Sequence, residues 1–170
     1  MPGEFPAERG RDFVNRVGLF FDDNFGFSIY ETAYEGEDAA SVFVAGEKIR
    51  FDFLMYQKKM GSTSTPKIHF YCECKWRTNP RDLKTEFGDF LKKALKATPE
   101  IQRRHPDSFH FMFVCNKPFG IDPSNLQSVE YIQGLLDGDY STDDLSHLSR
   151  RIGIVILPDW FLDITSGEKI

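Results

Sequence analysis

Apolar side chains recur along the chain with two different periods, and the periods alternate. In residues 12–24 and 83–95 they return every three or four positions, which is the period of an amphipathic helix. Residues 48–58, 68–76 and 108–115 are short runs rich in aromatic and aliphatic residues, which are typical of strands. Interleaved helices and strands predict an α/β domain with a sheet covered by helices.

Turn residues and shorter runs supply the remaining elements. Gly26 ends the first helix, and Asn79 followed by Pro80 predicts the start of the second long helix. The middle strands follow one another without an intervening helix, so we expect a mixed sheet rather than a purely parallel one. Further strands are expected at 27–35, 41–45 and 152–157, a helix at 122–138, a short helix or turn at 142–150, and polar connections at 36–40, 59–67 and 98–106.

Length and composition indicate one globular domain. A chain of 170 residues with 41% hydrophobic residues is long enough to bury a core. No apolar run approaches the length of a membrane span, and the polar N-terminus has no signal-peptide core. Three cysteines, an odd number, favour free thiols in a reducing cytoplasm. We therefore expect residues 1–170 to form a single cytoplasmic domain, either alone or as the N-terminal module of a longer protein.

Charge is unevenly distributed along the chain. The net charge is −5, yet residues 67–105 carry 10 Lys+Arg against 5 Asp+Glu, a local charge of +5. This asymmetry favours the approach of a polyanion to one side of the molecule. On charge alone, a solvated basic helix face is the plainer explanation.

Candidate chemistry begins in the strand at residues 68–76. Side chains alternate along a strand, so Tyr71, Glu73 and Lys75 share one face. A carboxylate and an ammonium on a largely apolar strand are costly to bury unless something uses them. Asp52 lies between two phenylalanines of the preceding strand. If the two strands pair, Asp52 and Glu73 converge, with Lys75 one step along.

Each of these signals is weak alone. An E-x-K sequence is usually a solvated strand edge, and Asp52 alone can be a strand-end acid that is hydrogen-bonded to the backbone. Cys72 and Cys74 have no paired histidine, so we expect them to pack as small apolar groups on the opposite face rather than to bind zinc. The sequence has neither a glycine-rich phosphate loop nor a nucleophile elbow.

The order of these features is more specific. A helix precedes a meander, an acid lies on its second long strand, E-x-K lies on the next, and an amphipathic helix follows at once. Over roughly residues 13–115, this order resembles the PD-(D/E)xK phosphodiesterase superfamily, with Asp52 and Glu73-Cys74-Lys75 as the motif residues. The opening helix resembles the Mrr-like restriction branch, which often has a metal-holding Glu where this chain has Val14. This departure weakens the case for a second metal.

The resemblance implies a restriction-endonuclease-like fold, with a central mixed sheet flanked by helices, and a Mg²⁺-dependent endonuclease in which Mn²⁺ can substitute. The metal ligands would be Asp52, Glu73 and the main-chain carbonyl of Cys74. Lys75 would orient or deprotonate the attacking water. We expect double-stranded DNA as the substrate, in a restriction or antiviral defence effector that forms a homo-oligomer or is fused to a sensor domain. The alternative, which Val14 favours, is a catalytically inactive module of the same fold for nucleic-acid binding or assembly.

The basic segment supplies the candidate phosphate contacts. Arg77 and Arg81 flank the end of the E-x-K strand and are the stronger candidates. The lysines of the following helix spread around it, so they cannot all face one nucleic-acid backbone. The full set is Arg77, Arg81, Lys84, Lys92, Lys93, Arg103 and Arg104.

Overall fold

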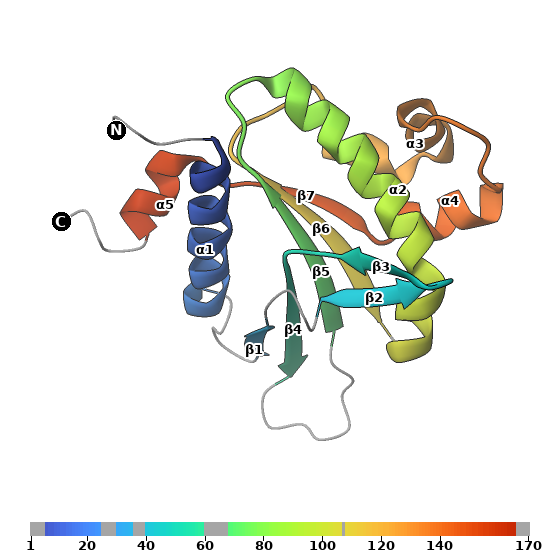
Figure 1. Ribbon diagram of the computed structural model, residues 1–170, viewed down its shortest axis with the longest axis horizontal. Helices are drawn as coiled ribbons and strands as arrows, with labels where there is room; N and C mark the ends of the chain where they lie inside the picture. Colours follow the sequence, from blue (N-terminus) through green and yellow to red (C-terminus); the bar gives the residue numbers. More distant parts are fainter. Residues whose placement is uncertain (1–5, 25–29, 36–39, 60–67, 107, 166–170) are drawn as a thin grey trace.

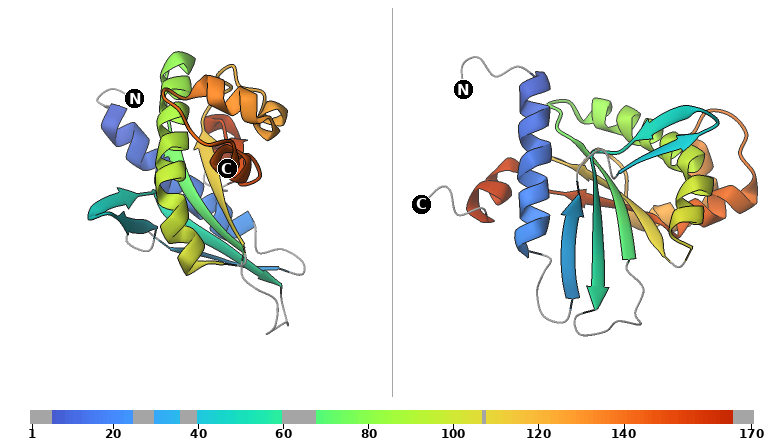
Figure 2. Two further views of the ribbon diagram at one scale, coloured as in Figure 1. Left: turned by 90° about the vertical axis from the view of Figure 1, so that its right-hand side faces the viewer. Right: turned by 60° about the horizontal axis from the view of Figure 1, so that its bottom comes forward.

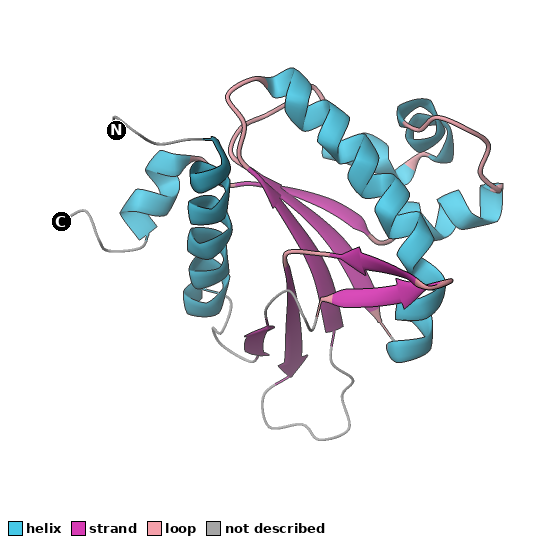
Figure 3. Ribbon diagram, viewed as in Figure 1, coloured by secondary structure: helices cyan, strands magenta, loops and turns pink. Residues whose placement is uncertain are grey.

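The central feature of the fold is a five-stranded sheet with strand order β1-β4-β5-β6-β7 (Figures 1 and 3). β1, β4 and β5 pair antiparallel, whereas β5, β6 and β7 pair parallel. The expected α/β class and mixed sheet are therefore confirmed. The strands are β1 (Tyr30–Glu35), β4 (Phe53–Lys59), β5 (Ile68–Lys75), β6 (Phe109–Cys115) and β7 (Ile152–Ile156).

The structure is a computed structural model. Residues 36–39 of the turn expected at 36–40, residues 60–67 of the connection expected at 59–67 and residues 27–29 of the strand expected at 27–35 lie outside the described residues. The described ranges are 6–24, 30–35, 40–59, 68–106 and 108–165.

Helices cover both faces of the sheet. α1 (Pro6–Asn24) and α5 (Asp159–Thr165) lie side by side on one face (Figures 1 and 2). The opposite face carries α2 (Pro80–Arg104) together with a 3₁₀ turn, α3 and α4. Phe13 of α1 packs in one buried cluster with Cys72, and Phe87 of α2 packs in the other with Tyr71. The alternation expected along β5 is thus confirmed. The smaller elements are η1 (Pro123–Gln127), α3 (Val129–Leu135) and α4 (Thr142–Ser149).

A separate hairpin packs beside the second half of α2 (Figure 2, right). It consists of β2 (Ser41–Val44) and β3 (Glu47–Arg50), joined by a two-residue turn. Both turn residues, Ala45 and Gly46, have positive φ, at 51° and 81°. Such a turn matches the right-handed twist of the strands it joins.

The single strand expected at 48–58 is wrong, because the chain bends between β3 and β4. Phe51 is only 1% exposed in the α2-side cluster, and its N–H donates to the carbonyl of Ala40. Phe53 is buried on the α1 side. The chain therefore passes from the hairpin into the main sheet between Phe51 and Phe53, and Asp52 occupies the bend.

The second long helix begins where the sequence predicts and ends later. Asn79 caps α2, its side chain accepting a hydrogen bond from the N–H of Arg81 at 2.9 Å. The polar connection expected at 98–106 is wrong for its first seven residues, because α2 continues to Arg104. Pro99 removes one backbone hydrogen bond there. Ala97 and Ile101 compensate, because they extend the buried stripe by another turn.

Two other expectations also need correction. The first helix starts at Pro6 rather than at residue 12. The single helix expected at 122–138 is divided into η1 and α3, because the side chain of Ser128 accepts a hydrogen bond from the N–H of Tyr131 and starts a new helix. No helix in the described ranges is both long and apolar enough to cross a membrane.

Candidate active site

A buried carboxylate on β5 is the centre of the candidate site. Glu73 points to the α2 side of the sheet, and the residue is only 7% exposed. Its Oε2 lies 3.7 Å from Nζ of Lys75, and its Oε1 lies 2.6 Å from Nζ of Lys93. A buried charge is tolerated when it is paired and hydrogen-bonded. The two ammonium groups therefore offset the cost of burying Glu73.

Lys93 reaches this carboxylate from α2. Its ammonium also donates to the main-chain carbonyl of Arg50 at 2.6 Å and lies 5.1 Å from the ring centroid of Phe51. From the sequence, Lys93 is expected only as a phosphate contact, and its contact with Glu73 is not foreseen. A usable signal is its place on the helix: Lys93 follows the buried Phe90 by three positions, so it borders the buried stripe.

Asp52 lies at the bend between β3 and β4, where the ladder of β4 with β5 ends. The last pair of that ladder joins Phe53 to Cys72. Beyond it, Oδ2 of Asp52 accepts a hydrogen bond from the N–H of Cys74 at 2.7 Å, and its own N–H donates to the carbonyl of Cys72 at 2.9 Å. Asp52 is therefore a strand-end acid that is hydrogen-bonded to the backbone, which is one of the two explanations considered from the sequence. The segment that it binds is the one that carries Glu73.

The charge of Glu73 acts on the carboxyl group of Asp52. Burial and, after it, the charge of Glu73 together raise the pKa of Asp52 to about 6, against the lowering effects of the Cys74 N–H, Lys75 and Lys93. Two carboxylates that repel one another while partly desolvated favour a bound cation between them. We call Asp52, Glu73, Lys75 and Lys93 the acid–lysine cluster.

The oxygen atoms near the cluster suit a hard divalent cation. The N–H and C=O of a strand residue point to the same side, so the Cys74 carbonyl projects toward the edge that Asp52 occupies. Two carboxylates and a carbonyl are ligands that Mg²⁺ accepts, with water completing its shell. Within the described ranges, no three His, Cys, Asp or Glu side chains gather to hold a metal. A metal here would therefore depend on the main-chain oxygen.

Neighbouring residues on the α1 side of the sheet take no part. Cys72 and Cys74 are buried in the α1-side cluster, as expected, and burial raises the pKa of both thiols. Val14, at the position where the Mrr-like branch often has a glutamate, packs against the same apolar cluster. It supplies no ligand to the acid–lysine cluster.

The seven predicted phosphate contacts do not form one surface. Arg77 pairs with Glu86, and its Nη1 donates to the carbonyl of Trp76 at 2.7 Å. Arg81 and Arg103 are both exposed but lie at opposite ends of α2, roughly 33 Å apart along the helix axis. Lys84 is exposed near the start of α2, and Lys92 and Lys93 lie near its middle, where they pair with Asp137 and Glu73. Near its end, Arg103 pairs with Glu100, and Arg104 donates to the Ser41 carbonyl.

Asn116 supports the chain just after the E-x-K segment. It is 8% exposed, and its side chain accepts from the Arg77 N–H at 3.0 Å and donates to the Arg77 carbonyl at 3.1 Å. Replacing Asn116 by alanine leaves both backbone groups of Arg77 without these partners. We expect the free energy of unfolding to fall by about 1–3 kcal/mol, measured by chemical denaturation.

Asn125 provides the matched control for this prediction. It is exposed in η1, so Asn125→Ala is expected to change stability by less than about 0.5 kcal/mol. Equal losses for the two variants would contradict the bracing role of Asn116.

Two comparisons with known proteins give no relative of this chain. The geometry of the acid–lysine cluster is therefore the basis for inferring a function. A scan against protein-family models finds no match to the chain, and a search of curated proteins finds none either.

Proposed function

We propose that the protein is a metal-dependent endonuclease with the restriction-endonuclease-like fold, which hydrolyses phosphodiester bonds in DNA. The observation that carries the proposal is the position of Asp52 next to the Glu73-Cys74-Lys75 segment, where the N–H of Cys74 donates a hydrogen bond to its carboxylate. The mixed sheet, with α1 before the motif and α2 directly after it, further supports this fold.

The residues present fit a Mg²⁺ ion, with Asp52, Glu73 and the Cys74 carbonyl as its ligands. When bound, the ion would polarise the scissile phosphate and lower the pKa of a water molecule. Lys93 offsets the charge of Glu73 and holds this carboxylate against β3 through the Arg50 carbonyl. It is a positioning residue rather than a catalytic one.

Lys75 is the residue best placed to act on the reacting groups. Its side chain is 28% exposed, whereas that of Glu73 is 9% exposed, so the ammonium reaches solvent while it remains 3.7 Å from the carboxylate. From there it orients the attacking water and offsets the negative charge of the pentacovalent transition state.

Plasmid digestion tests the proposal directly. With Mg²⁺ or Mn²⁺ we expect nicked and linear DNA with 5′-phosphate and 3′-hydroxyl ends, and with EDTA we expect none. A parallel digestion of RNA separates the two substrates. If neither nucleic acid is cut with either metal, the endonuclease proposal fails.

A second candidate is a catalytically inactive module of the same fold that binds nucleic acid. Val14 favours it, since an apolar side chain occupies the position of a common acidic ligand and packs away from the cluster. Binding without cleavage in both metals would select this candidate.

A further inference from the structure

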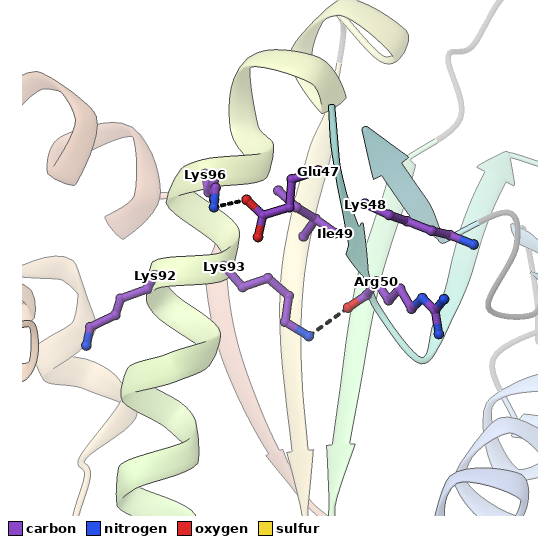
Figure 4. A pocket seen from close by; sticks show the side chains of 7 residues that line it. All are labelled: Glu47, Lys48, Ile49, Arg50, Lys92, Lys93 and Lys96. Atoms are coloured by element: carbon purple, nitrogen blue, oxygen red, sulfur yellow. Dashed lines mark hydrogen bonds and ion pairs between the residues drawn. The ribbon is translucent and has the colours of Figure 1, made fainter. Parts of the chain in front are cut away.

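A cleft of about 380 Å³ lies between β3 and α2 (Figure 4). Lys48 and Arg50 line it from β3, and Lys92, Lys93 and Lys96 line it from α2. Five of its seven lining residues are basic and one is acidic, a formal excess of four positive charges. A concave surface of one sign concentrates its field and attracts counterions of the opposite sign.

The basic groups form a band across the two elements. In Figure 4, Lys93 and Lys96 extend from α2 toward β3, whereas the charged ends of Lys48 and Arg50 lie on the outer side of β3. Lys92 extends from the opposite flank of α2. The band is therefore wider than a site for one small anion, and its charges are spaced along a path.

Two ion pairs within this band, those of Lys96 and Lys92, are weak competitors for a ligand. Lys96 pairs with the exposed Glu47, and Lys92 lies 3.5 Å from Asp137, whose side chain is fully exposed. Exposed pairs of this kind contribute little and exchange readily. Lys48 makes no ion pair with any residue that the structure describes.

Lys93 joins the band to the acid–lysine cluster. Its ammonium lies 2.6 Å from Glu73 Oε1 and 2.6 Å from the carbonyl of Arg50, which is part of the cleft wall. A ligand that follows the band across the cleft therefore passes next to Lys93, which contacts Glu73 and whose charge acts on Asp52.

We propose that this cleft, together with the basic groups on its two rims, is the phosphate-binding surface that holds a nucleic-acid strand beside the acid–lysine cluster. The inference rests on the proposed function for the reaction, but the binding itself can be tested without turnover. It assigns phosphate contacts to Lys48, Arg50 and Lys92 rather than to the arginines at the two ends of α2. The chemistry recognised is a row of phosphodiester charges, which DNA duplex, single-stranded DNA and RNA share.

Two triple variants with the same loss of charge test the inference. The first, Lys48→Gln, Arg50→Gln and Lys92→Gln, removes charge from the band while leaving Lys93 in place. The control, Arg81→Gln, Lys84→Gln and Arg103→Gln, removes exposed charge from the rest of α2. Thermal melting establishes that both remain folded. Affinity is measured by fluorescence anisotropy with labelled duplex DNA, single-stranded DNA and RNA in Ca²⁺, from about 50 to about 200 mM salt.

The band variant is expected to bind at least one of the three probes roughly tenfold or more weakly, with a log–log salt slope smaller by about two to three units. The control is expected to stay within about twofold of the wild type, because its charges lie outside the path. The probe that loses most identifies the substrate.

Equal losses in the two variants, or no measurable binding of any probe by the wild type at low salt, would overturn the inference. Cleavage distinguishes this failure from failure of the proposed function. If the wild type cleaves and the band variant binds with unaltered affinity, only the proposal for the cleft is overturned. Loss of binding in the band variant, in a protein that cuts nothing, supports the cleft and overturns only the endonuclease.

Discussion

Replacing Lys75 or Asp52 by alanine is expected to reduce metal-dependent DNA cleavage by at least about a hundredfold, into the background of the assay. Lys75→Ala removes an ammonium that lies 3.7 Å from Glu73, and with it the charge that is proposed to stabilise the transition state. Asp52→Ala removes one of the two proposed carboxylate ligands. The initial rate of plasmid nicking at saturating Mg²⁺ measures both effects.

Controls on α2 separate chemistry from folding. Lys84→Ala is matched to Lys75→Ala, and Asp89→Ala is matched to Asp52→Ala. Each control removes one exposed charge of α2 and is expected to cut at close to the wild-type rate. Circular dichroism and thermal melting of Lys75→Ala establish that it remains folded. A wild-type cleavage rate in either Lys75→Ala or Asp52→Ala would remove that residue from the active site.

Asp52→Asn is expected to stabilise the metal-free protein at neutral pH by about 1–2 kcal/mol, a rise in melting temperature of roughly 2–8 °C. The pKa of Asp52 is raised to about 6 from an ordinary 3.8, chiefly by burial. Its ionised form is therefore less favourable in the folded protein than in the unfolded chain. An asparagine has the same shape and can still accept the Cys74 N–H without carrying a charge.

The pH dependence gives this prediction its sign. A carboxyl with a raised folded-state pKa contributes stability below its unfolded pKa of about 4 and loses it as the pH rises through about 6. The advantage of Asp52→Asn should therefore be small near pH 4, grow between about pH 4 and pH 6, and remain level above that. Melting curves in EDTA across this range measure it.

The wild type and Asp52→Asn share every other titratable group. The difference between their melting temperatures at each pH therefore reports on Asp52 alone. The pKa of His105, for example, is lowered to about 4 by burial and by nearby His69 and Arg104. The fold therefore loses stability as the pH falls through this acidic range, and it does so equally in the wild type and in Asp52→Asn. Asp89→Asn, on the exposed surface of α2, controls for loss of charge. A variant that is less stable at neutral pH, or equally displaced at every pH, would contradict the raised pKa.

The parts of the site that depend on local pattern can be predicted from the sequence. Alternation along β5 places Glu73 and Lys75 together on the side opposite Cys72, and the Asn79-Pro80 pair starts α2 at the correct residue. Each of these features depends on the geometry of a single helix or strand, and that geometry is determined by residues that are close together in the sequence.

The parts that depend on contacts between distant segments cannot be predicted in this way. The bend at Asp52 arises because Phe51 and Phe53 are buried on opposite sides of the sheet, although the run around them has the composition of a continuous strand. The contact between Lys93 and Glu73 requires α2 to cross β5 at one particular place. Such a crossing is set by the packing of the entire apolar stripe, and no local signal specifies it.

The hairpin of β2 and β3 gives the two walls of the cleft different local stability. It shares no ladder with the main sheet, and its buried side chains, Val42 and Ile49, rest on the α2 side of the molecule. A two-stranded hairpin is marginal by itself, so it can open as a cooperative unit without breaking a hydrogen bond of the five-stranded sheet. One wall belongs to the global unfolding unit of the protein, whereas the other belongs to a smaller unit that opens at lower free energy.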